Sequence, residues 1–73
     1  MTTKRVVQYH IARLKDKRPD IRLQAIRELE LLADPDALAP LKVVYTNDED
    51  PEVRRVAQEA GRTIFLKNWK KKN

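Results

Sequence analysis

A short phrase in this 73-residue chain occurs twice, and the repetition restricts the possible folds more than any other feature. Residues 19–22 read PDIR, and residues 51–54, which begin 32 positions later, read PEVR. Ala25 and Ala57 continue the match. A unit that recurs with a period of roughly 20 to 50 residues is typical of solenoids, in which each unit buries its apolar face against the next. The repetition therefore predicts two stacked copies of one structural unit.

Apolar residues recur at helical spacing along the chain, which predicts an all-α fold. The first helix is expected over about residues 4–15 and the second over about 19–33, while the third starts at Asp34-Pro35 and the fourth at Asp50-Pro51. Aspartate before proline is typical of a helix N-cap followed by the first helical position. Pro40 should bend the third helix or confine it to an irregular first turn. Four helices with short loops predict two stacked antiparallel hairpins.

The expected organisation is a single domain over residues 1–73. It consists of repeat one over about 4–33, repeat two over about 34–66 and a basic tail over 67–73. No apolar run approaches the roughly 18 residues that a membrane span needs. The first residues lack the unbroken apolar stretch of a secretory signal. We therefore expect a cytoplasmic protein without a membrane span.

Residues that could carry catalysis are scarce. His10 is the only histidine, and it lies beside an apolar stripe, where packing of the ring is the expected role. Serine and cysteine are absent. Both are common nucleophiles of acyl transfer, and cysteine is also a common zinc ligand. Most carboxylates fall at predicted helix starts and loops, where free backbone amides explain them. The sequence therefore predicts no enzyme activity, no metal site and no cofactor.

The phrases themselves, PDIRLQAIRELELLADPDALAPL over residues 19–41 and DPEVRRVAQEAGRTI over 50–64, resemble the HEAT repeats. In particular they are similar to the short bacterial type called phycobilisome-lyase-like. The resemblance implies an α-solenoid with a curved surface lined by the second helix of each repeat. Proteins with such repeats include scaffolds, relatives of chromophore lyases and DNA-repair proteins with a basic inner face, so it is specific for fold rather than for function.

Two arginines at equivalent places, Arg22 and Arg54, are candidate structural residues. The resemblance implies a ladder in which each arginine pairs with a loop aspartate. Bidentate bonding of a guanidinium to a carboxylate suits this task. An anion site on the inner face is the functional alternative. The candidate ladder carboxylates are Asp34 and Asp50, with Asp16 and Asp48 as further possibilities.

The candidate partner-binding residues point away from the apolar stripes at about 100° per residue. On the second helix they are Leu23, Ile26 and Arg27, and on the fourth they are Arg55, Gln58, Arg62, Leu66 and Trp69. These are the faces that, by resemblance, line the inner surface. Contact with a neighbouring helix is the alternative for Leu23 and Ile26. For Trp69 the alternative is folding back with Phe65 over the end of the second repeat.

The net charge of +5 comes from the first helix and from a lysine-rich C-terminus, and it would attract acidic proteins or phosphate backbones. The sequence predicts a non-enzymatic protein-binding or scaffold module, whose partner is an acidic protein or a larger complex. A nucleic-acid-binding protein is the alternative, disfavoured because Glu30 and Glu59 share the relevant helices. A homodimer is also predicted, through Val6, Val7 and Tyr9 at one end and Phe65 and Leu66 at the other.

Overall fold

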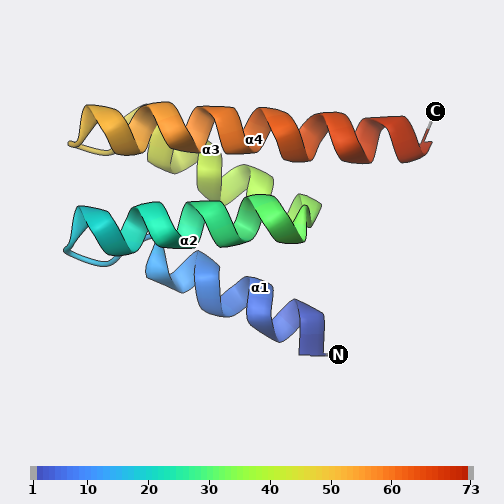
Figure 1. The fold of residues 1–73 in the computed structure, drawn as a ribbon, viewed down its shortest axis with the longest axis horizontal. Coiled ribbons are helices and arrows are strands. Elements are labelled where there is room, and N and C mark those ends of the chain that lie inside the picture. Colours follow the sequence, from blue (N-terminus) through green and yellow to red (C-terminus); the bar gives the residue numbers. More distant parts are fainter. Residues whose placement is uncertain (1, 73) are drawn as a thin grey trace.

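The computed structural model describes residues 2–72, and over these residues the fold is built from helices alone (Figure 1). The elements in chain order are α1 (Thr2–Arg13), α2 (Pro19–Leu32), the 3-10 turn η1 (Pro35–Ala37), α3 (Leu38–Asn47) and α4 (Pro51–Lys72). The predicted all-α fold of two helical hairpins is confirmed.

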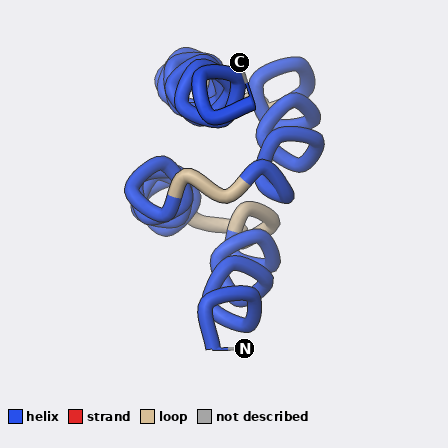
Figure 2. The backbone as a smooth tube through the Cα atoms, turned by 90° about the vertical axis from the view of Figure 1, so that its right-hand side faces the viewer, coloured by secondary structure: helices blue, strands red, loops and turns tan. Residues whose placement is uncertain are grey.

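The helices form two layers. Figure 2 shows α2 and α4 nearly end-on and side by side, with α1 and α3 on the other side of the molecule. Successive helices run in opposite directions, so that α1 pairs with α2 and α3 pairs with α4 (Figure 1). The two hairpins meet mainly through α2 and α4. A single apolar core runs through both hairpins, as expected for stacked units that cannot bury their faces alone.

Helix starts follow the predicted capping chemistry at two places. The Asp34 carboxylate accepts a hydrogen bond from the Asp36 amide at 2.8 Å, and the Asp50 carboxylate accepts one from the Glu52 amide at 2.8 Å. Pro40 is the third residue of α3, after the 3-10 turn, and its missing N–H costs little in a first turn. The irregular turn is η1, which ends before Pro40, and Pro40 itself lies in the first turn of the regular helix α3.

The core corrects two predictions. Ile26, predicted to face a partner, has no exposed surface, because it points across the hairpin boundary into the core that both repeats share. Val7, predicted to be available for dimerisation, is also fully buried, because it belongs to the apolar stripe of α1. Gln58, at the place in repeat two that Ile26 holds in repeat one, is exposed. The equivalent position is thus apolar at Ile26, where the second hairpin packs, and polar at Gln58, where the side chain is exposed to solvent.

The last helix is longer than the helices around it. With 22 residues α4 projects beyond the end of α2, and residues 67–72 of the predicted basic tail continue it as helix (Figure 1). Asn68 ties this extension to the first repeat, because its Nδ2 donates to the Ala33 carbonyl at 3.0 Å. Ala33 ends α2 in the left-handed conformation with φ 55°. Within residues 2–72, no helix combines the length and apolar content that crossing a membrane requires.

Candidate functional site

An arginine–aspartate pair joins the two repeats. The Nε and Nη2 atoms of Arg22 on α2 donate to the two carboxylate oxygens of Asp48 at 2.8 and 3.0 Å. Nη1 donates to the Asp16 carbonyl at 2.8 Å and to the Lys17 carbonyl at 3.1 Å. Both side chains of the pair are less than a tenth exposed. This bidentate geometry satisfies the guanidinium and its carboxylate away from water, as the predicted structural role of Arg22 requires.

The prediction that Asp34 and Asp50 pair with the ladder arginines is wrong. Asp34 pairs with Lys4, and Asp50 accepts bonds from the first amides of α4, so neither reaches an arginine. The reason is that an aspartate preceding a helix uses its oxygens as an N-cap. The period of the repeat would have indicated the partner. Asp16 and Asp48 are 32 residues apart, as are Arg22 and Arg54, so the loop aspartate that recurs with the arginine is Asp48. Arg54 donates to the Asp48 carbonyl at 2.6 Å.

A second tie links the start of α1 to the turn between the repeats. Lys4 Nζ donates to Asp34 Oδ2 at 2.8 Å and to Asp36 Oδ2 at 2.9 Å. The hydrogen bond from Lys4, with that from the Asp36 amide, lowers the pKa of Asp34. The bonds to Asp34 and then Asp36 raise the pKa of Lys4. The Asp34 side chain is largely buried whereas Lys4 is exposed, so this pair holds the N-terminal helix against repeat two.

We expect this pair to make stability depend on pH. A lowered carboxyl pKa adds stability above the unfolded-state pKa, about 4 for aspartate, and this stability is lost as the pH falls through the folded-state value. The raised lysine pKa adds stability that is lost only as the pH rises through the folded value, above about 10.4. Lys4→Met should therefore lower the melting temperature at pH 7, and the difference from wild type should shrink below about pH 4.

Thermal melts of the two proteins across this range measure the effect. Arg5→Met, which removes an exposed cation from the same helix, is the matched control and should behave like the wild type at every pH. A Lys4→Met deficit that persists undiminished in acid would contradict the assignment of the stability to this ion pair.

The predicted partner-binding residues other than Ile26 divide into one half-buried side chain and a set of exposed ones. Leu23 packs partly against the core. The exposed residues lie on α2 and α4 and are Arg27, Arg55, Gln58, Arg62, Leu66 and Trp69. The helices α2 and α4 lie side by side in one layer (Figure 2), and we call the surface formed by these exposed residues the α2–α4 face.

The α2–α4 face carries charges of both signs. Arg55 donates to Glu52 at 2.8 Å and to Glu59 at 2.9 Å, so both neighbouring carboxylates engage it. The hydrogen bond from Arg55 lowers the pKa of Glu52, and the charge of Arg27 across on α2 contributes to the same shift. Exposed helix pairs of this kind contribute only tenths of a kcal/mol to stability. They place two carboxylates beside Arg55 on this face.

The projecting end of α4 exposes large apolar side chains. Phe65, Leu66 and Trp69 are each about half exposed. Phe65, Asn68 and Trp69 line a shallow hollow of about 240 Å³ with Pro35 and Leu38 of the neighbouring turn and helix. Trp69 therefore lies beside the end of repeat two and still offers surface to a partner. Of the predicted basic tail, the side chains beyond Trp69 fall outside the described residues.

His10 has the packing role that the sequence predicts. It is buried, its ring meets that of Tyr9 edge-on with centroids 5.1 Å apart, and its Nδ1 lies 3.1 Å from Nη1 of Arg13. Within residues 2–72, no group of histidine and carboxylate side chains is arranged to hold a metal ion.

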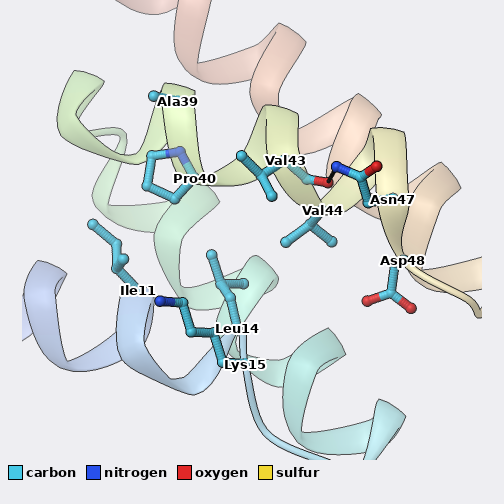
Figure 3. Close-up of a pocket in the computed structure, with 9 residues that line it drawn as sticks. All are labelled: Ile11, Leu14, Lys15, Ala39, Pro40, Val43, Val44, Asn47 and Asp48. Atoms are coloured by element: carbon cyan, nitrogen blue, oxygen red, sulfur yellow. Dashed lines mark hydrogen bonds between the residues drawn. The ribbon is translucent and has the colours of Figure 1, made fainter.

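A groove between α1 and α3 was missed by the sequence reasoning. Figure 3 shows the side chains that line it. They are Ile11, Leu14, Lys15, Ala39, Pro40, Val43, Val44, Asn47 and Asp48. Val43, which lines the groove, is 60% exposed.

Comparison with protein families finds one match, to a family described as HEAT repeats, over residues 2–61. This match covers both hairpins up to the middle of α4. It does not distinguish the phycobilisome-lyase-like type suggested by the motifs. Neither the curated proteins nor the solved structures contain a match to the chain.

Proposed function

Because this chain belongs to the HEAT-repeat family, whose members generally mediate protein–protein interaction or act as scaffolds, we propose that it is a non-catalytic protein-binding module. Its contact surface is the α2–α4 face together with the projecting end of α4. The residues concerned are Leu23, Arg27, Arg55, Gln58, Arg62, Leu66 and Trp69, with Phe65 added from the structure.

The observation that carries this proposal is the cluster of half-exposed apolar side chains on α4. Phe65, Leu66 and Trp69 lie within two turns of one helix and next to the mixed charges of the α2–α4 face. Buried aromatic anchors surrounded by polar residues are the usual composition of binding hot spots. A protein partner with an apolar patch, ringed by charges of either sign, would match this surface.

The charge pattern favours a protein over a nucleic acid. Phosphate backbones attract a run of unpaired cations, but Arg55 is held between Glu52 and Glu59. Nucleic-acid binding should weaken steeply as salt rises, while contact through Trp69 and Leu66 should not. The cytoplasmic location, the homodimer and the division into repeats remain predictions from the sequence.

We expect a Trp69→Ala variant to lose most partner binding. Tagged chain would be used to capture proteins from a lysate, with and without nuclease treatment, at low and high salt. Loss of a central tryptophan anchor costs on the order of 2 kcal/mol, or about 30-fold in affinity. Tyr9→Ala is the matched control, because Tyr9 is an exposed aromatic residue on α1, away from the α2–α4 face. Circular dichroism would show that both variants are folded.

Two outcomes would contradict the proposal. Capture that disappears with nuclease and falls log-linearly with salt would assign the surface to nucleic acid. Capture that depends on Tyr9 but not on Trp69 would move the contact to α1.

A further inference from the structure

The groove between α1 and α3 is an apolar hollow of about 540 Å³ (Figure 3). Its floor is formed by Leu14 and Val44, which are nearly fully buried. Ile11 forms the wall on α1, and Pro40 and Val43 form the wall on α3. The volume lies within the range of roughly 300 to 1,000 Å³ that ligand sites occupy in proteins. The lining is aliphatic, so water in the groove has few polar partners.

Small residues on α3 help to keep the groove open. Ala39 and Pro40 lie opposite Ile11 and do not extend far enough to fill the space (Figure 3). Val43 stands at the edge with 60% of its surface exposed. A groove between two helices accepts a third helix, whose apolar side chains at positions i, i+3 or i+4 and i+7 enter it.

The charge at the groove decides which helix fits. Of the two charged residues in the lining, Asp48 is already bonded by Arg22 and by the Asp50 amide. Lys15 has no ion pair with any residue in the described part of the chain, and its side chain runs toward Ile11 (Figure 3). Lys15 and Asp48 also line an adjoining polar hollow with Asp16 and Glu49, but neither Asp16 nor Glu49 lines the groove. The groove therefore offers an apolar floor and one available cation.

We propose that this groove binds an acidic amphipathic helix of a partner protein, with apolar side chains over Leu14 and Val44 and a carboxylate on Lys15. A second copy of this chain fits less well, because most of its exposed large apolar residues lie on α1 and the projecting end of α4, and both segments are rich in cations that Lys15 would repel. No residue of α2 or α4 lines the groove, so the site is separate from the α2–α4 face and stands independently of the proposed function.

The test is selection of displayed random helical peptides on the full chain, followed by binding of the selected synthetic peptides. The enriched sequences should carry leucine-like residues at helical spacing and at least one acidic residue. Val43→Asp should weaken their binding at least about tenfold. Leu31→Asp is the matched control, because Leu31 is a still more exposed aliphatic residue on α2 and lies outside the groove.

A charge exchange provides the second arm. Lys15→Glu should weaken the acidic peptides, and replacing their acidic residue by lysine should restore binding to that variant, whereas Lys17→Glu should have no comparable effect. Restoration of binding also shows that the variant is folded. The proposal is overturned if no peptide is enriched, if enriched peptides ignore Val43→Asp, or if Lys15→Glu binds them as well as wild type. It is also overturned if sedimentation shows a dimer that Val43→Asp dissociates, since the occupant is then a second copy.

Discussion

Replacing Arg22 by alanine is expected to remove a large part of the stability of this protein. The substitution leaves the Asp48 carboxylate, which is less than a tenth exposed, without its bidentate partner. It also removes the donors to the carbonyls of Asp16 and Lys17. Breaking a buried ion pair from one side costs about 3–5 kcal/mol. A chain of this length has a total free energy of unfolding of roughly 4 to 11 kcal/mol.

Urea unfolding followed by circular dichroism measures this effect. Arg54→Ala is the matched control, because Arg54 holds the equivalent place but donates to a single carbonyl of its own loop, where the expected loss is about 1 kcal/mol. Equal losses for the two variants would show that the link between the repeats adds nothing beyond local loop bonding. An Arg22→Ala variant with unchanged stability and lost binding would make Arg22 a recognition residue.

The second large effect is expected at Ile26, where replacement by alanine should cost about 2–5 kcal/mol. The side chain is completely buried in the core shared by the two hairpins, so truncation removes apolar contact and leaves a cavity between them. Leu31→Ala is the control. Leu31 is 77% exposed on the same helix, and its truncation should change stability by less than about 0.5 kcal/mol. Comparable losses at both positions would contradict the core assignment of Ile26.

The periodicity of apolar residues was sufficient to predict the helices and their pairing, and the error at Ile26 shows where it stops being sufficient. A helix in a stack has two apolar directions, one toward its own hairpin and one toward the next repeat. A single stripe drawn at 100° per residue finds only the first. Comparison of equivalent positions would have separated them, since Ile26 is apolar and buried in the shared core, whereas Gln58 is polar and exposed.

The candidate site was predictable only in part, for different physical reasons. The exposure of Arg27, Arg62 and Trp69 follows from their helix phase. The involvement of Glu52 and Glu59 with Arg55 depends on which rotamers the side chains adopt, which spacing alone does not determine. The groove depends on how far α1 stands from α3, a tertiary quantity that no local pattern encodes.

The arginine ladder has a further consequence for how a chain of this kind sets its length. Arg22 donates to a carbonyl of its own loop and to the carboxylate of Asp48, 26 residues later, whereas Arg54 donates to a carbonyl of its own loop and, among the described residues, to no carboxylate. The arginine–aspartate bonds therefore fix how one repeat is aligned on the next, and the same bonds could form between further repeats. Whether a further repeat can pack depends separately on apolar surface, which is present at Ile26 and absent at Gln58. If a third hairpin were added by design after α4, Arg54 could bond its loop carboxylate, but Gln58 would give it no apolar surface to pack against. Such an extension would therefore require an apolar residue at position 58 and no change at Arg54.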